Sequence, residues 1–588
     1  MSVKKICVEK DQRICDNGDK NLKVVINSLD YDSLAKIFML LPVPERIDME
    51  KVCTKWKEAC QLAWYDIKKY KCESSIGRCY DNRLLTQPYL KKILLRCGNY
   101  LNELSLSDIC NSRIMPFVGD HCKNLTTLEC KFNDDSLIDN ADHFVQAFTQ
   151  LDKLKCIKIT VGHDCSNEII NLSAIFDSLP EEINEIYLFS EPIWDVRVRN
   201  ISMSVRRFRN LQKLTAVGIL LNNINFQEIA DLTTLVYLSI GLHSNIHKNH
   251  SLFKKLVNLE YIKVTIGTED DTDNISTEEL ETIFCTCRNL KHLDIPRGLY
   301  NIAGIPLEKW INFQNLQHLG IACRLMPDLA NAIVKYCKNL KHLRIYYSYA
   351  AMDNTALEKL TELENLECLI LDGPNYLHEE LIIAISKNCK KLKRLEIPAC
   401  IIVPAIDDDP LSSPSVLDEL SKLQYLEHLN LRCVENVKDS TIIAIANNCK
   451  NLKSLNIQDC RSLTKTAFVA LTNLKNLQIL NVSYLDILDS FIIKLKGLRK
   501  LYCNQCTNLT DIGIIQFIKN NPDLELLNLC SHDYITIRTV ITADQETKNR
   551  TNGIILHILI SVPSILQASK SIIKSQWLVV GTGDVPYF

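Results

Sequence analysis

A short apolar phrase recurs down most of this 588-residue chain and constrains its fold more than any other feature. The phrase is apolar at its first, fourth and sixth positions, as in CKNLKHLRI (337–345) and CKNLKSLNI (449–457). We count 17 copies, at intervals of 21 to 34 residues. Their first residues are Leu101, Leu125, Leu154, Ile183, Leu211, Leu235, Leu259, Leu290, Leu316, Leu340, Leu366, Leu392, Leu426, Leu452, Leu477, Leu498 and Leu524.

This period predicts a solenoid of stacked units. The fourth and sixth residues of the phrase are apolar and are separated by one residue, which is the alternation of a strand. An apolar helical stretch follows, as in residues 511–518. One such unit cannot bury its own apolar side, so neighbouring units must stack. The interval lies in the leucine-rich-repeat range. The predicted fold class is therefore α/β, a curved leucine-rich-repeat horseshoe over residues 97–530.

Charge and hydropathy exclude two classes of protein. The formal net charge is −2, whereas general nucleic-acid binders usually carry a basic excess. The best apolar run, residues 554–566, is too short to span a bilayer. We therefore expect neither a nucleic-acid partner nor a membrane partner.

The 25 cysteines fall mostly at fixed places in the repeat. Because the chain begins with no apolar stretch of the kind that directs secretion, we expect reduced thiols in the cytoplasm or nucleus. A reduced cysteine packs as a small apolar residue. Those three residues before a first repeat position are Cys122, Cys287, Cys337, Cys389 and Cys449, and those eight residues after one are Cys400, Cys460 and Cys506. The pair Cys503 and Cys506 is interpreted as repeat packing, since no second pair completes a zinc site.

The rest of the chain divides into four segments. Residues 1–21 are polar and predict a flexible tail, and residues 22–70 predict short helices. Residues 71–96 lead into the repeats as a linker or N-terminal cap. Residues 531–588 keep their apolar content and predict a C-terminal cap, which a solenoid end needs. Two acidic insertions in the repeats, 267–274 and 404–414, are expected to be loops.

The helical segment carries a second motif. Leu34, Ile37, Phe38 and Leu41 recur at three- and four-residue steps, which places them on one helix face. A Val-Cys-x-x-Trp sequence follows at residues 52–56. In order and spacing the segment resembles an F-box. The residues that carry the resemblance are Leu29, Leu34, Ile37, Phe38, Leu41, Val52, Cys53 and Trp56.

Two positions depart from the F-box pattern. Asp30 stands where that family usually has proline, and Arg46 stands where it often has leucine. The first departure is expected to weaken docking of a partner. The second is expected to be offset by Ile47.

An F-box followed by cysteine-bearing leucine-rich repeats resembles the F-box/leucine-rich-repeat family. The resemblance implies a non-catalytic substrate receptor of Skp-cullin-F-box ubiquitin ligases, without a cofactor. Its F-box would bind a Skp-family adaptor through the eight residues given above, the adaptor would bind a cullin-RING scaffold, and the repeats would hold a protein substrate. Independently, three short helices of about 45 residues bury only part of their apolar side chains, so a partner groove is expected to cover the rest.

Two alternatives stay open on the sequence alone. The helical segment is either an F-box or a plain helical cap on the solenoid. The whole chain is either a ligase receptor or an interaction scaffold that binds or sequesters a partner without ubiquitin transfer. An enzyme has no residues to carry it, since no nucleophile elbow, phosphate-binding glycine loop, His-Glu-x-x-His or dinucleotide fingerprint occurs.

The third position of the repeat phrase supplies candidate substrate contacts. His292, His318, His342 and His428 share it, which predicts adjacent imidazoles on the inner face. A titrating or metal-binding ladder is conceivable there, but a surface residue kept through repeat duplication is the preferred interpretation, and no metal site is predicted. The predicted inner-face contacts are His292, Asp294, His342, Arg344, Tyr346, Asp372, Arg394, Glu396, His428, Asn430, Arg432 and Asn456.

Overall fold

The computed structural model covers the whole chain and divides into two compact units, Met1–Ile67 and Lys68–Phe588. The predicted flexible tail and the two acidic insertions lie outside the residues that the structure describes. Those described residues are 26–72, 85–107, 110–132, 141–161, 169–190, 199–242, 252–266, 277–296, 302–346, 353–373, 376–403, 415–532, 534–550, 552–575 and 577–582.

The first unit is a bundle of three short helices. They are α1 (Tyr31–Met39), α2 (Val43–Met49) and α3 (Thr54–Ala63), preceded by one turn of 3₁₀ helix, η2 (Ile26–Ser28). Pro42 separates α1 from α2, because a proline at the start of a helix cannot continue the preceding one. A core of Leu34, Ala35, Phe38, Trp56, Ala59, Cys60 and Ala63 holds α1 against α3.

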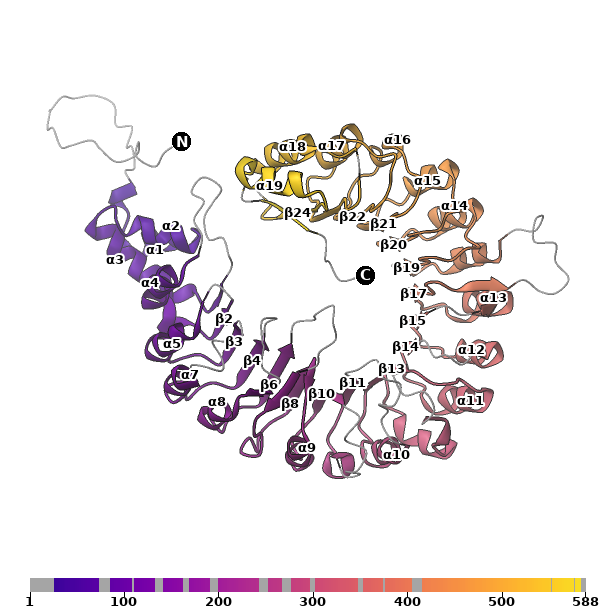
Figure 1. The fold of residues 1–588 in the computed structure, drawn as a ribbon, viewed down its shortest axis with the longest axis horizontal. Coiled ribbons are helices and arrows are strands. Elements are labelled where there is room, and N and C mark those ends of the chain that lie inside the picture. The colour runs from indigo at the N-terminus through magenta and orange to yellow at the C-terminus, as the bar shows by residue number, and fades with distance from the viewer. Residues whose placement is uncertain are drawn as a thin grey trace. The chain divides into compact units, whose positions relative to one another are not determined.

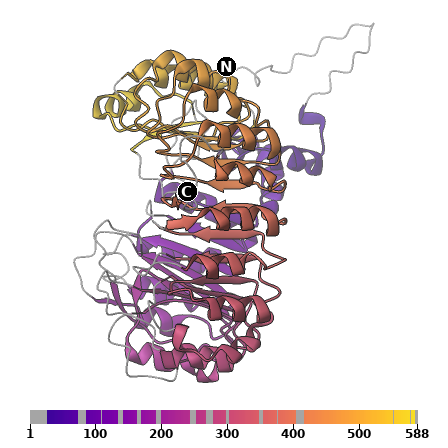
Figure 2. The same cartoon turned by 90° about the vertical axis from the view of Figure 1, so that its right-hand side faces the viewer.

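The second unit is built on one long parallel sheet. Within it the strands line the inner side of a curved stack, and the helices cover the outer side (Figures 1 and 2). In the described part of the chain the sheet has 20 strands. They are β1 (Lys69–Lys71), β2 (Glu103–Leu106), β3 (Thr127–Phe132), β4 (Cys156–Val161), β6 (Glu185–Ser190), β8 (Lys213–Val217), β10 (Tyr237–Leu242), β11 (Tyr261–Ile266), β12 (His292–Ile295), β13 (His318–Ile321), β14 (His342–Ile345), β15 (Cys368–Leu371), β17 (Arg394–Glu396), β19 (His428–Asn430), β20 (Ser454–Asn456), β21 (Ile479–Asn481), β22 (Lys500–Tyr502), β23 (Leu526–Asn528), β24 (Leu556–Leu559) and β25 (Leu578–Gly581).

The repeat phrase accounts for the strand positions. Each of the 17 phrases holds one strand that begins two residues after the first apolar residue, as β20 does after Leu452. The leucine at the fourth position points into the core, and the residues beside it face the inner side. The predicted α/β leucine-rich-repeat solenoid is therefore confirmed.

Helices of one to three turns connect the strands on the outer side. In some repeats a 3₁₀ segment takes this place: η7 (Leu252–Lys255), η9 (Leu307–Phe313) and η10 (Val416–Lys422). Two minor parallel ladders join β5 (Ile169–Asn171), β7 (Arg199–Ser202) and β9 (Ile219–Leu220), and β16 (Tyr376–His378) with β18 (Ile401–Val403). The α-helices are α4 (Gln87–Cys97), α5 (Met115–His121), α7 (Ala141–Phe148), α8 (Ser173–Ser178), α9 (Asn223–Ala230), α10 (Thr277–Thr286), α11 (Pro327–Tyr336), α12 (Asn354–Leu360), α13 (Glu379–Asn388), α14 (Asp439–Asn448), α15 (Lys465–Leu471), α16 (Asp489–Ile492), α17 (Asp511–Asn520), α18 (Ile537–Lys548) and α19 (Pro563–Ile572). In these described ranges every helix is too short or too polar to cross a lipid bilayer.

The sheet extends beyond the predicted repeat range at both ends. At the front, β1 spans the boundary between the predicted helical segment and the predicted linker, and it pairs with β2. At the back, β24 and β25 lie inside the predicted cap and pair in register with β23 and with each other. The parallel sheet of the described residues therefore continues past residue 530 through β24 and β25, within the segment predicted to be a C-terminal cap.

The repeat cysteines are buried free thiols. Several donate to a backbone carbonyl of the preceding repeat, as Cys460 does to Leu431 (Sγ to O 3.1 Å) and Cys506 to Val482 (3.2 Å). Burial raises the pKa of Cys287 and Cys337 to about 12, so both stay protonated donors at neutral pH. The predicted role of these cysteines as packed thiols is confirmed.

A ladder of asparagines that the sequence did not reveal ties neighbouring repeats together. The asparagine just before the first leucine of a phrase donates its amide to a carbonyl one repeat earlier. The contacts join Asn339 Nδ2 to the Gln314 oxygen (2.8 Å) and Asn451 Nδ2 to the Gln424 oxygen (3.0 Å). The repeats that carry this contact are thereby fixed to the one before them at the helix-to-strand turn.

Removing one of these asparagine hydrogen bonds is expected to lower the stability of the solenoid by a small, measurable amount. Asn451→Ala should lower the free energy of unfolding by about 1 kcal/mol, the usual net contribution of one hydrogen bond. Urea unfolding followed by circular dichroism measures it. The matched control is Gln424→Ala, which keeps the accepting carbonyl and should change stability by less than about 0.5 kcal/mol. Equal losses in both variants would contradict the assignment.

Candidate functional site

The helical unit separates its motif residues into a core and a surface. Leu34, Phe38 and Trp56 are buried, and the rings of Phe38 and Trp56 lie 5.2 Å apart. Leu29 and Leu41 pack against this core and are half-buried. The side chains of Leu34, Phe38 and Trp56 face the unit's own interior, and contact of these motif residues with an adaptor stays a prediction.

Other apolar side chains of the unit lie in solvent. Ile37 is 37% exposed, Val52 is 39% exposed, and Cys53 is also exposed. The structure adds Leu40, which is 83% exposed and which the sequence analysis did not single out. Its signal was present, since Leu40 lies three residues after Ile37 on the same side of the chain's first helix. These four residues, Ile37, Leu40, Val52 and Cys53, are called the apolar surface below.

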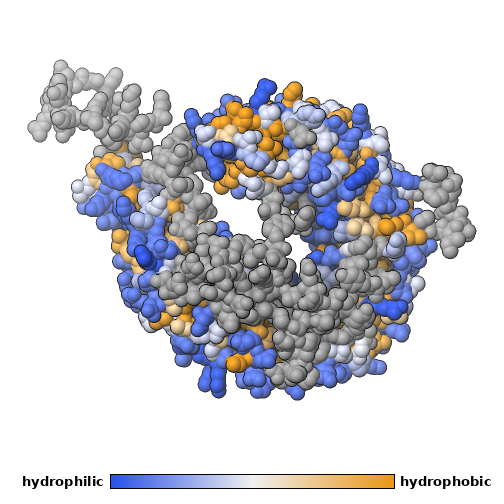
Figure 3. All heavy atoms as spheres, in the orientation of Figure 1, coloured by the Kyte–Doolittle hydropathy of each residue, from blue (hydrophilic) through white to orange (hydrophobic). Residues whose placement is uncertain are grey.

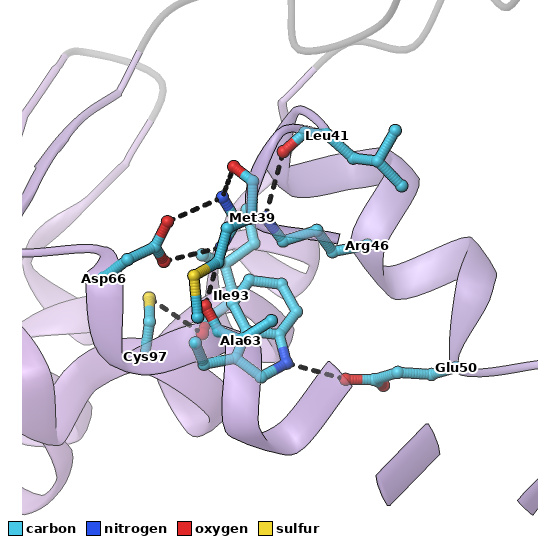
Figure 4. Close-up of polar contacts among 9 residues, drawn as sticks. Met39, Leu41, Arg46, Glu50, Ala63, Asp66, Ile93 and Cys97 are labelled. Atoms are coloured by element: carbon cyan, nitrogen blue, oxygen red, sulfur yellow. Dashed lines mark hydrogen bonds and ion pairs between the residues drawn. The ribbon is translucent and has the colours of Figure 1, made fainter. Parts of the chain in front are cut away.

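Arg46 organises the polar contacts of the helical unit (Figure 4). Its guanidinium is buried and uses all five of its N–H groups. Nε donates to the Leu41 oxygen (2.9 Å) and Nη2 to the Met39 oxygen (2.6 Å), at the end of α1. Nη1 donates to the Ala63 oxygen (2.9 Å), at the end of α3. Asp66 accepts the remaining two bonds, at 2.7 and 3.0 Å.

The departure at position 46 therefore has a structural explanation. The last carbonyls of a helix have no partner within the helix and carry a partial negative charge. One guanidinium supplies donors and positive charge to two such helix ends and pairs with a carboxylate. A leucine at this position would leave those carbonyls and Asp66 without these donors. The expectation that Ile47 offsets the change is replaced by this network.

Asp30 also has a clear local role. It is the N-cap of α1, and its carboxylate accepts from the Ser33 amide (2.7 Å) and the Ser33 hydroxyl (3.1 Å). The hydrogen bond from the Ser33 amide holds the pKa of Asp30 below its usual value. Asp30 therefore starts the first helix of the unit by capping its free amides.

The inner face of the sheet carries a stack of aromatic rings, one from each of five successive strands. The centroids of Tyr237 and Tyr261 are 3.9 Å apart, those of Tyr261 and His292 are 3.9 Å apart, and those of His292 and His318 are 3.8 Å apart. His342 continues the row at 5.8 Å from His318. The predicted adjacency of these histidines is confirmed by their register across β12, β13 and β14.

Burial controls the charge of this row. Desolvation lowers the pKa of His292 to about 3 and that of His318 to about 4, and neighbouring imidazoles and Lys263 act in the same direction. Asp294 opposes the shift at both rings but does not overcome the burial. Both imidazoles are therefore neutral at pH 7.

Asp294 lies beside the row at the centre of a charged network. Its carboxylate accepts from the Tyr346 hydroxyl (2.7 Å) and pairs with Lys263 (3.2 Å). Tyr346 reaches Asp294 from two strands away, over Gly320 on the strand between them. Arg344 lies 4.5 Å from the Tyr346 ring centroid and makes an ion pair with Asp372 (2.6 Å).

Several of the remaining predicted inner-face residues contact residues of their own or a neighbouring repeat. Arg394 pairs with Glu396 on its own strand, and Asn430 approaches Glu396 at 3.4 Å. Asn456 is buried, and its side chain accepts from the backbone amide of Gln458 (3.0 Å). Asn430 makes the same turn with Arg432 (3.1 Å). Both side chains thus close a turn at the end of their strand, and their contact with a substrate stays a prediction.

Hydrophobic residues also gather on the outer side over α17 and α18 (Figure 3). Ile512 on α17 and Ile541 on α18 are exposed there. Exposed apolar residues are common on soluble proteins. Exposure alone therefore does not identify a binding surface, and the helical unit is distinguished by the spacing of its motif.

Comparison with curated sequences finds relatives of low identity, and no family model matches the chain. The chain is 33% identical over 159 residues to Antagonist of mitotic exit network protein 1 of Saccharomyces cerevisiae, covering 25% of this chain and 28% of that protein. It is 27% identical over 203 residues to the protein of the same name in Eremothecium gossypii, covering 32% and 47%. The match thus spans less than half the length of either relative.

Two solved structures resemble the fold at 15% identity. An internalin of Listeria monocytogenes aligns with a TM-score of 0.32 over 65% of this chain and 83% of its own. A chain from the Rad7–Elc1 complex in yeast aligns with a TM-score of 0.28 over 90% of each chain. The solenoid assignment rests on the strand pairing described above.

Proposed function

We propose that this chain is the substrate-recognition subunit of a Skp-cullin-F-box ubiquitin ligase. Its helical unit binds a Skp-family adaptor, which connects it to a cullin-RING scaffold, and the inner face of its repeats binds a protein substrate. The observation that carries the proposal is the apolar surface, which stays exposed on a three-helix unit whose own core is already filled by other residues of the same motif.

The division of the motif residues supports this assignment. A helix that docks in a groove needs a packed inner side and an apolar outer side. Leu34, Phe38 and Trp56 supply the first, and Ile37 and Leu40 supply the second. Arg46 and Asp30, the two departures from the family pattern, are engaged in contacts within the unit, which leaves the apolar surface available.

The proposed mechanism is proximity. The receptor forms no covalent bond itself; the isopeptide bond forms at the ubiquitin-charged enzyme on the scaffold. A substrate held by the solenoid meets that enzyme at a raised effective concentration, which converts a bimolecular encounter into one within a complex. The free, buried thiols of the repeats support a reducing compartment, the cytoplasm or nucleus, as its place of action.

Charge introduced on the apolar surface tests the adaptor contact. Ile37→Asp combined with Leu40→Asp is expected to weaken binding of the full-length chain to a purified Skp-family adaptor by more than about 100-fold, because two buried interface positions would each place an unpaired charge in an apolar groove. Calorimetry or co-purification measures it. Circular dichroism and Trp56 packing check that the unit remains folded.

The matched control is Leu62→Asp, since Leu62 is an exposed leucine of the same unit outside the motif. It should bind as the unchanged chain does. The proposal fails if the unchanged chain does not bind the adaptor, or if Leu62→Asp weakens binding as much as the double variant does.

The second candidate function is an interaction scaffold that sequesters a partner without ubiquitin transfer. The name of the relatives, Antagonist of mitotic exit network protein 1, is compatible with this second function. A protein can antagonise a network by holding one component away from the others. The half-life of the bound partner separates the two functions. A ligase receptor shortens it, and proteasome inhibition restores it; a sequestering scaffold leaves it unchanged.

A further inference from the structure

Two adjacent strands of the inner face bring three metal-ligating side chains together. His292 and Asp294 lie two residues apart on β12, so both point to the same side of the sheet. On β13, His318 pairs with His292, and Gly320 pairs with Asp294. These four positions are neighbours in the sheet. Three of them carry a side chain that can bind a metal, and the fourth is a glycine.

The spacing and chemistry of these side chains fit one ion. One ligand atom from each of the three residues lies within 4.8 Å of the other two. Tetrahedral zinc with bonds of about 2.0–2.2 Å places its ligand atoms roughly 3.4 Å apart. The His292 and His318 rings are stacked at an interplanar angle of 13°, so they must rotate out of the stack for one nitrogen of each to face the same ion. Imidazole ligands favour zinc and the later transition metals over calcium or magnesium.

We propose that His292, Asp294 and His318 form a binding site for a divalent transition-metal ion such as Zn²⁺ on the inner face of the solenoid. Three protein ligands leave a fourth coordination position for water or for a donor side chain of a bound protein. The site does not depend on the adaptor proposal, because its residues all belong to the repeats. It revises the interpretation of the histidine column as a tolerated surface feature.

Gly320 makes room for the carboxylate. A Cβ atom at this position would overlap Asp294 Oδ1 and would lie 3.2 Å from the Tyr346 ring. With hydrogen alone at position 320, the Asp294 side chain leans across β13 towards the side of His318. The glycine therefore determines where the third ligand lies, although it offers no ligand atom itself.

One ring nitrogen of the site is buried and unpaired in the described part of the chain. The Nε2 atom of His292 is buried and has no hydrogen-bond partner among the residues that the structure describes. Buried polar atoms are nearly always paired, so this nitrogen is one that a ligand would satisfy.

Tyr346 and Lys263 contact the carboxylate of Asp294. The Tyr346 hydroxyl donates to Oδ1 (2.7 Å), which orients the carboxylate as second-shell donors do at metal sites. Lys263 contacts Oδ2 at 3.2 Å, and its ammonium must withdraw when a cation binds. This movement is feasible because the Lys263 side chain is partly exposed and long.

Titration of the full-length, chelator-treated chain with Zn²⁺ and with Co²⁺ tests the site. One equivalent is expected to bind, with a cobalt visible spectrum that lacks thiolate charge-transfer bands, since the site has no cysteine. His318→Ala and Asp294→Asn should each lower the affinity by at least about 100-fold, because losing a second-shell group alone costs 10–100-fold. Gly320→Ala should also weaken binding, although every ligand residue remains.

The matched control is His428→Ala. His428 occupies the same repeat column, but its neighbours in the sheet are Arg394 and Ser454. It should bind metal as the unchanged chain does. The proposal is overturned if the unchanged chain binds no metal, if thiolate bands appear, or if His318→Ala and His428→Ala lose affinity equally. A Gly320→Ala variant with full affinity would remove Asp294 from the ligand set. Asp294→Asn preserves side-chain size, so the test stands even if His318→Ala misfolds.

Discussion

Replacing Arg46 with methionine is expected to lower the free energy of unfolding of the helical unit by about 3–5 kcal/mol. Methionine fills a similar volume but donates no hydrogen bond. The carbonyls of Met39, Leu41 and Ala63 and the carboxylate of Asp66 would each lose a donor. The contact with the Ala63 carbonyl is buried, and leaving a buried carbonyl unpaired costs more than its bond contributes, whereas the Asp66 side chain is 30% exposed and can turn to water.

Amide hydrogen exchange over residues 31–66 of the full-length chain measures this effect. Protection should fall by at least about 100-fold, since 1.4 kcal/mol corresponds to a factor of ten. The matched control is Lys51→Met, whose exposed ammonium pairs with Asp48 (2.7 Å). An exposed pair contributes at most about 1 kcal/mol. If Arg46→Met keeps full protection, the guanidinium does not hold the three helices together.

Ile558→Asp is expected to lower the stability of the C-terminal repeats by more than about 3 kcal/mol. Ile558 is fully buried on β24 and pairs with Leu527 on β23 and Val580 on β25. A carboxylate at this position would be taken out of water with no cation to pair with it. Because each repeat of a solenoid depends on its neighbours, the loss should spread to β23.

Exchange of the β23 amides, Leu526–Asn528, reports that spread. Val579→Asp is the control, because Val579 lies on the adjacent strand β25 and is 45% exposed. Its effect should stay within about 0.5 kcal/mol. Unchanged exchange at β23 in the Ile558→Asp variant would mean that the last two strands are not coupled to the repeats before them.

The strand positions were predictable because one physical requirement repeats. The fourth residue of each phrase is an inward leucine or its equivalent, and a slip of one residue would turn it to solvent. Two strands of the long sheet outside the 17 phrases, β1 and β24, have the same apolar spacing. Ile67, Tyr70 and Cys72 have this spacing around β1, and so do Ile555, Ile558 and Ile560 around β24. β25 departs from it, because Thr582 stands at the sixth position, so the phrase alone does not predict that strand.

The candidate sites were less predictable. They depend on which way each side chain points and on contacts between residues that are distant in the sequence. Helical spacing places Leu34, Ile37 and Phe38 on one broad face, but only packing against α3 decides that Ile37 is the outer one. No local pattern shows that Arg46 meets Asp66. The histidine column was visible as a pattern; its ligand geometry required the register that sets Gly320 opposite Asp294.

The one-dimensional stacking of the repeats has a thermodynamic consequence. Along the sheet each described strand pairs only with the strands on either side of it, so in the described part of the chain no strand pairing spans the whole array. Heat or denaturant can then melt a stretch of coils while the rest persists, and the melting curve depends on which stretch the probe reports. A single midpoint temperature would describe an average over cooperative blocks, and spectroscopic probes placed at the two ends should disagree.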